Sequence, residues 1–208
     1  MVFNLPNNYK LRESYKERNL YYKFFAGYFF NEFISTIDER TIAFIKRLKE
    51  IVLNEENRFI GDKKITLEQL DAIQNETKYI TFDYHVAQFY KGNKDRGEMS
   101  DILIYSKQNF ISIECKYLSN MSYKKDIEEV QSRIKIAESE FNSKGIQVLL
   151  MKESKFKNST NSNKENSFAK KIENHNHVIP TIILFWEDLL AMTTDTAVKE
   201  YLINQLKR

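Results

Sequence analysis

Two short segments at 101–105 and 110–117 constrain the fold of this chain most strongly. Both are rich in isoleucine and aromatic residues, and the stretch 106–109 between them is polar. Two such segments separated by a short polar stretch are typical of a β-hairpin with antiparallel strands. An isolated two-stranded hairpin is at best marginally stable in water, so the rest of the chain has to supply further strands and helices.

The length of the turn sets which residues of the two strands face each other. If the turn comprises 106–109, Tyr105 faces Phe110, and counting back along the ladder places Asp101 opposite Glu114. Directly opposed residues of an antiparallel pair have Cβ atoms roughly 5 Å apart on one face of the sheet. We call Asp101 and Glu114 the acidic pair, and we expect Asp101 to open the first strand.

The side chain of Lys116 is expected on the same face as Glu114, because side chains alternate along a strand. The same alternation turns Cys115 to the opposite face, where a small core residue is expected. Two carboxylates held this close repel each other, unless a cation lies between them or one of them is protonated. The hairpin therefore predicts a divalent metal site beside a lysine.

The remaining pattern predicts an α/β fold with a mixed central sheet flanked by helices. The helix that follows the hairpin allows a parallel crossover to the next strand, and Gly145 is placed to end that helix. Pro180 limits its strand to an edge, or lies near the strand start. Helices are expected at 20–37, 36–54, 66–77 with Thr66 as N-cap, 124–144 and 186–206, and strands at 79–90, 146–151 and 178–185.

A length of 208 residues suits a single domain with one core. Lysine, asparagine and serine dominate one late segment, which is typical of a flexible loop, with a short helix expected at 168–172. The expected organisation is a helical N-terminal elaboration at 1–60, a core at 66–152 that carries the acidic pair, the loop at 153–177 and a closing strand and helix at 178–208.

Composition excludes several classes of protein. A single cysteine excludes an internal disulfide framework and fits a reducing compartment. The most apolar early run, at 20–34, is too short and too polar to cross a bilayer, and no secretory signal is evident. We therefore expect a soluble cytoplasmic protein with no membrane partner. The net charge of +3 is too small to identify nucleic-acid binding by itself.

The spacing of Gly97, Asp101 and the run Glu114-Cys115-Lys116 resembles the signature of the PD-(D/E)XK nuclease superfamily, which includes many restriction endonucleases. Ser100 stands where the family name has proline, a common departure that removes no metal ligand. The family core is a helix, a three-stranded meander, a helix and a further strand. The expected elements at 66–152 come in that order, so the resemblance implies a restriction-endonuclease-like core.

The resemblance also implies a role for each site residue. The acidic pair would bind Mg²⁺, for which Mn²⁺ can substitute, and the backbone carbonyl of Cys115 would be a further ligand. Lys116 would hold or activate the attacking water. The family often adds an acid from the helix before the meander, for which Glu68 is the first candidate and Glu76 the second.

The function that the resemblance implies is metal-dependent cleavage of DNA, in a restriction or other defence role. Basic residues flank the acidic pair in sequence, which fits phosphate binding. Homodimerisation fits the cutting of two strands. The candidate phosphate contacts are Lys91, Lys94, Arg96, Lys124 and Lys125.

Two alternatives stay open at this point. One is an inactive nuclease fold that binds nucleic acid or a protein partner. The other is an RNA endonuclease on the same core, which only His85 supports, since a histidine on a strand leading to the site can assist a metal. The run His175-Asn176-His177 spells the letters of a different nuclease class, but its surroundings do not supply that class's ββα metal fold.

Overall fold

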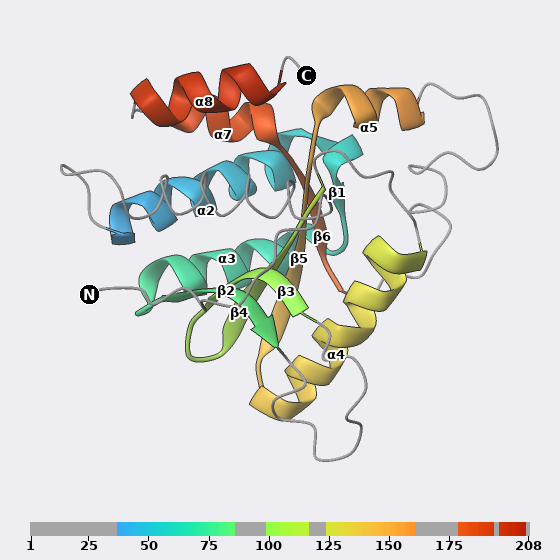
Figure 1. The fold of residues 1–208 in the computed structure, drawn as a ribbon. Helices are drawn as coiled ribbons and strands as arrows, with labels where there is room; N and C mark the ends of the chain where they lie inside the picture. The colour runs from blue at the N-terminus through green and yellow to red at the C-terminus, as the bar shows by residue number, and fades with distance from the viewer. Residues whose placement is uncertain (1–36, 86–98, 117–123, 161–178, 194–195, 207–208) are drawn as a thin grey trace, which may run out of the picture.

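A computed structural model describes residues 37–85, 99–116, 124–160, 179–193 and 196–206 (Figure 1). Several predictions therefore lie outside the described residues. They concern the helix at 20–36, the end of the strand at 86–90, and most of the segment 161–178, with its short helix.

The described strands form one six-stranded mixed sheet in the order β1-β6-β5-β4-β3-β2. The pairs β4–β5 and β5–β6 are parallel, and the other three pairs are antiparallel. The strands are β1 (Phe59–Ile60), β2 (Tyr79–His85), β3 (Met99–Tyr105), β4 (Asn109–Cys115), β5 (Lys144–Met151) and β6 (Thr181–Phe185).

Helices cover both faces of this sheet (Figure 1). One face packs on α2, α3 and α7 through a core that includes Phe44, Leu70 and Trp186. The other face packs on α4, η3 and α5. The helices are α2 (Ile37–Asn54), η1 (Glu56–Arg58), α3 (Lys63–Asn75), η3 (Lys124–Glu129), α4 (Val130–Phe141), α5 (Glu153–Thr160), α7 (Trp186–Met192) and α8 (Thr196–Leu206).

This architecture confirms the predicted fold class. The elements α3, β2, β3, β4, α4 and β5 follow one another as helix, three-stranded meander, helix and parallel strand. The helix α2 occupies 37–54, in agreement with the predicted helix at 36–54. No helix within the described ranges is long and apolar enough to cross a membrane.

The predicted register of the hairpin is confirmed. Tyr105 pairs with Phe110, and the Ser106 amide donates to the Asn109 carbonyl across 2.8 Å. The turn therefore has the even length on which the facing of the acidic pair depends. The first strand begins at Met99, two residues earlier than predicted, because Met99 and Ser100 pair with β2.

Two predicted helix ends are wrong. The N-cap of α3 is Asp62, whose carboxylate accepts from the Ile65 amide, whereas Thr66 is buried inside the helix. The helix α4 ends at Phe141, and its C-cap Asn142 takes the left-handed conformation with φ 47°. Gly145 instead lies in β5, where a Cβ would meet the Ile134 side chain at 2.4 Å, so glycine lets α4 pack closely on the sheet.

Two further predictions need correction, and one strand was not predicted. The helix α5 occupies 153–160, the beginning of the segment predicted as a loop. The closing helix is two helices, α7 and α8, because Thr193 ends the first in an extended conformation. The short strand β1 was not predicted, and its pairing makes β6 an inner strand. Pro180 lies just before the start of β6, which confirms the second of its two predicted positions.

Candidate functional site

The sheet directs both members of the acidic pair to one face. Leu103 of β3 and Phe110 of β4 pack on α4, so alternation places Asp101 and Glu114 on that face too. Both lie at the end of the hairpin away from the turn. This end coincides with the carboxyl ends of the parallel strands, because Cys115 is the last paired residue of β4.

The ladder between β3 and β4 ends at the pair Ile102–Ile113, and one further step places Asp101 opposite Glu114. Here the Cys115 amide donates to Asp101 Oδ2 across 2.7 Å, so a carboxylate takes the place of a strand carbonyl. Hydrogen bonds of this length to a charged acceptor are among the stronger ones in proteins. The bond therefore fixes the Asp101 carboxylate against β4.

Lys116 lies on the same face, as predicted. Its Nζ pairs with Glu114 Oε1 across 2.8 Å, and the two side chains are 18% and 13% exposed. The Lys116 amide donates to the Leu150 carbonyl across 2.7 Å, and the indole N–H of Trp186 donates to the Lys116 carbonyl across 3.3 Å. The lysine is therefore held at the main chain and paired at its side chain.

Cys115 is 4% exposed and belongs to the core that faces α2 and α3, which confirms that its thiol faces away from the acidic pair. The N–H and C=O of one strand residue point to the same side, as in the hydrogen-bonded pairs of an antiparallel ladder, which exchange both bonds. Because the Cys115 amide reaches Asp101, its carbonyl belongs on the Asp101 side as well. This direction fits the predicted role of the carbonyl as a ligand.

The donors at this end of the hairpin fit a hard divalent cation, which prefers carboxylate and carbonyl oxygen. The acidic pair and Lys116 together carry a net charge of −1. Two unit charges about 5 Å apart repel by about 3 kcal/mol at an effective dielectric constant near 20. No cluster of three or more His, Cys, Asp or Glu side chains suited to a metal occurs among the described residues.

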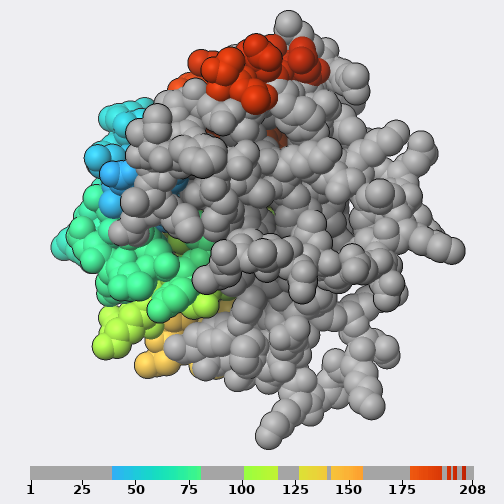
Figure 2. All heavy atoms as spheres, turned by 60° about the vertical axis from the view of Figure 1, so that its left-hand side comes forward, coloured from blue at the N-terminus to red at the C-terminus, as the bar shows by residue number. Residues whose placement is uncertain are grey.

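The second candidate for a third acid from α3, Glu76, lies away from the acidic pair. Glu76 Oε2 accepts from the Lys107 amide across 3.2 Å, which ties the end of α3 to the turn, the opposite end of the hairpin. In Figure 2 the hairpin is the yellow-green surface below the green surface. Glu68 is exposed on α3, whose core face packs on the side of Cys115. Its catalytic role stays a prediction.

Most of the predicted phosphate contacts lie outside the description of the structure. Lys91, Lys94 and Arg96 belong to the undescribed stretch 86–98, and the side chain of His85 is likewise not described. The backbone of Lys124 and Lys125 opens η3, two residues before Ile127, which packs on Leu149 and Met151. Because Leu149 pairs with Glu114, η3 begins near the end of the sheet that carries the acidic pair.

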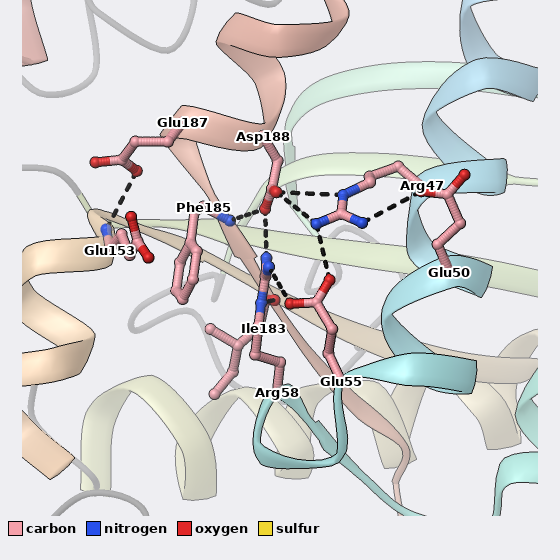
Figure 3. Close-up of polar contacts among 9 residues, drawn as sticks. All are labelled: Arg47, Glu50, Glu55, Arg58, Glu153, Ile183, Phe185, Glu187 and Asp188. Atoms are coloured by element: carbon pink, nitrogen blue, oxygen red, sulfur yellow. Dashed lines mark hydrogen bonds and ion pairs between the residues drawn. The ribbon is translucent and has the colours of Figure 1, made fainter.

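A second group of charges lies at the junction of α2, η1 and α7 (Figure 3). We call Arg47, Glu55, Arg58 and Asp188 the arginine cluster. Asp188 Oδ1 accepts from Arg47 Nη2 across 2.7 Å, and Asp188 Oδ2 accepts from Arg58. Glu55 accepts from both arginines, each across 2.8 Å. The four charges sum to zero. Arg58 meets two carboxylates, and Arg47 meets the same two and also the exposed Glu50, whose Oε2 accepts across 3.2 Å.

The arginine cluster is a structural feature. Arg58, 4% exposed, also donates to the Ile183 carbonyl across 3.0 Å and lies 3.8 Å above the Phe185 ring. Burial acts to raise the pKa of Asp188, but bonds from Arg58, the Phe185 amide and Arg47 outweigh it and lower that pKa. Burial acts to lower the pKa of Arg47, but Asp188 outweighs it and raises that pKa. Both groups therefore stay charged as partners.

One contact of the site, the hydrogen bond between Trp186 and Lys116, was not predicted from the sequence. The pattern predicts Trp186 as the start of a closing helix, and the helix α7 does begin there. Its distance of 70 residues from Lys116 leaves no local signal for the hydrogen bond. The only sequence feature that could have drawn attention to it is that the chain contains a single tryptophan.

Comparisons with known proteins add little to this geometry. No family model matches the chain. No curated protein sequence matches it either. Among solved structures, the chain is similar to the small subunit of the heterodimeric restriction endonuclease R.BspD6I, with a TM-score of 0.30 and 14% sequence identity over 81% of this chain and 88% of that one. A TM-score of 0.30 is too low to carry a conclusion about this chain.

Proposed function

We propose that this protein hydrolyses phosphodiester bonds of DNA with Mg²⁺, as a restriction-type or other defence endonuclease. The observation that carries the proposal is the acidic pair at the end of a confirmed hairpin register, with the Lys116 ammonium 2.8 Å from Glu114. A strand end gains no stability from two facing carboxylates, so this arrangement is better explained by a ligand than by the fold.

In this proposal Asp101, Glu114 and the Cys115 carbonyl hold the cation, which would polarise the phosphoryl group and lower the pKa of a bound water. The Asp101 carboxylate is oriented in advance by the Cys115 amide. The Lys116 ammonium holds the attacking water or offsets the charge on the phosphate. Its partial burial strengthens that interaction, since screening by solvent is weaker away from bulk water.

DNA is the proposed substrate because basic residues precede and follow the acidic pair along the chain. Lys124 and Lys125 open a helix that begins at the same end of the sheet, and Lys91, Lys94 and Arg96 precede β3 in sequence. Lysine and arginine contacts to phosphate fix the position of a nucleic acid without reading its sequence. A second copy of the chain would supply the second site needed to cut both strands.

The test is a cleavage assay on plasmid and single-stranded DNA, with Mg²⁺, with Mn²⁺ and with chelator. We expect the wild type to cleave with either metal, and Asp101→Asn, Glu114→Gln and Lys116→Met to lose cleavage. Matched controls come from the other end of the same hairpin. Glu76→Gln and Lys107→Met change the same residue types near the turn and are expected to leave cleavage intact.

The outcomes separate the alternatives. Absence of cleavage by folded wild type, together with binding of DNA or of a protein, would favour an inactive binding module. Cleavage of RNA but not DNA would favour the RNA endonuclease, and His85→Ala would then be the next variant. Equal cleavage by wild type and Asp101→Asn would overturn the proposed site, whatever the substrate. Glu68→Gln tests the remaining prediction of a third acid.

A further inference from the structure

Lys116 lies one residue beyond the end of β4, where the ladder no longer fixes the chain on both sides. Two main-chain bonds hold it. Its amide donates to the Leu150 carbonyl across 2.7 Å, on the side of β5. Its carbonyl accepts from the indole N–H of Trp186 across 3.3 Å. The second bond comes from a side chain of another element, so the position of Lys116 depends on where α7 lies.

Trp186 is itself held firmly. It is 0% exposed, and it is the first residue of α7, directly after β6. The first turn of α7 is fixed because Asp188 accepts from the Phe185 amide across 2.8 Å and from Arg58. The indole N–H is the only polar group of this side chain, and it is directed to the Lys116 carbonyl.

We propose that Trp186 is a positioning residue for Lys116. Its indole holds the main chain from which the Lys116 side chain extends toward Glu114, and the arginine cluster holds the indole through the first turn of α7. This inference deepens the proposed function, on which its catalytic consequence rests. The holding of Lys116 by Trp186 can be measured whether or not the protein cleaves DNA.

The experiment uses the fact that the chain has one tryptophan. Expression in a tryptophan-auxotrophic host with 3-benzothienylalanine replaces the indole N–H by sulfur at this position alone and keeps the size of the ring. The matched control is 5-fluorotryptophan, which keeps the N–H. Trp186→Phe, which shortens the ring and removes the N–H, serves as a second variant if the benzothienyl protein does not fold.

Two readouts are measured on each protein. The first is hydrogen exchange at the Lys116 amide, which we expect to become about tenfold faster in the benzothienyl protein, as in a local opening. Exchange at the Ile113 amide, within the ladder, is expected to stay unchanged. The second is cleavage, in which kcat is expected to fall about tenfold or more, as for other orienting contacts, with KM for DNA unchanged.

The two hypotheses fail in different ways. If Lys116 exchanges at the same rate in the benzothienyl and fluorinated proteins, Trp186 does not hold it and the inference is wrong. Uniformly faster exchange across β4 would also overturn it, because the indole would then only stabilise the fold. If the wild type cleaves nothing but Lys116 alone exchanges faster, the proposed function fails while the positioning contact stands.

Discussion

The acidic pair lies within one hairpin, the arginine cluster joins elements far apart in the sequence, and the two groups differ in how their carboxylates are paired. In the arginine cluster the carboxylates of Asp188 and Glu55 each accept from two guanidinium groups, and Arg47 also pairs with the exposed Glu50. At the acidic pair Glu114 pairs with the Lys116 ammonium, and Asp101 accepts from the Cys115 amide. The ion pairs of the arginine cluster stabilise the fold, whereas we propose that the acidic pair holds a cation.

The two groups also differ in how they affect the free energy of unfolding. Partnered charges at partly buried positions stabilise the native state relative to either partner alone. Facing carboxylates do the opposite, and functional sites commonly reduce stability in this way. Substitutions that remove charge should therefore have opposite effects in the two places, and this contrast can be tested.

The largest expected effect is that of Asp101→Asn on cleavage. Loss of a metal ligand removes several kcal/mol of transition-state stabilisation, which corresponds to a rate about 10³-fold lower. The amide oxygen can still accept from the Cys115 N–H, so the free energy of unfolding is expected to stay within about 1 kcal/mol of wild type or to rise. Cleavage rates and urea denaturation of the same sample measure the two effects. A large loss of stability would contradict the expected difference between the acidic pair and the arginine cluster.

Asp188→Ala is expected to have the next largest effect, on stability. It leaves Arg58 buried without one of its two carboxylates, at a cost of about 3 kcal/mol. For a chain of this length Tm should then fall by about 6–12 °C. The matched control is Asp71→Ala, which removes an exposed carboxylate paired with Lys49 and is expected to cost about 1 kcal/mol or less. Differential scanning calorimetry measures the Tm of both variants. Equal falls in Tm would refute the distinction between buried and exposed ion pairs.

Divalent cations should raise the free energy of unfolding of the wild type, by less than Asp188→Ala lowers it. Ca²⁺ at about ten times its Kd would add about 1.4 kcal/mol, because it binds the native state alone. The corresponding rise in Tm is about 3–6 °C. Asp101→Asn should show little of this rise, whereas Asp188→Asn should keep it. An equal rise in Asp101→Asn and wild type would place the cation elsewhere in the molecule.

The smallest effect concerns pH. The pKa of Asp188 is lowered in the native state, so the unfolded chain binds the proton more readily. The stability from this carboxylate is therefore present above its unfolded pKa of about 3.9 and is lost as pH falls through the native pKa. Below about pH 5, Asp188→Asn should lose stability less steeply than wild type, by at most about 1.4 kcal/mol per pH unit. Denaturation from pH 6 to pH 2 tests this, and parallel curves would contradict it.

The hairpin was the most predictable part of the fold, for local reasons. A four-residue turn and the alternation of side chains fix the register without reference to the rest of the chain. The pairing of Tyr105 with Phe110 then follows, and so does the common face of Glu114 and Lys116. The long amphipathic pattern of α2 was equally readable.

Features that depend on packing between distant elements were not predictable. Gly145 looked like a helix end, but its role is to admit the Ile134 side chain and the Phe110 ring. The two-residue strand β1 is too short to carry a pattern and exists because β6 offers an edge. Asp62, and not Thr66, is the N-cap of α3, because the helix begins one turn earlier than predicted.

The sequence by itself determined the acidic pair, the lysine beside it and the order of elements that supports them, because these follow from alternation, turn length and periodicity. Tertiary structure alone decided what surrounds them. It placed Glu76 at the turn, away from the acidic pair, and brought Trp186 to the Lys116 carbonyl. These contacts join residues that are 31 and 70 positions apart, and only the packing of helices on the sheet fixes such distances.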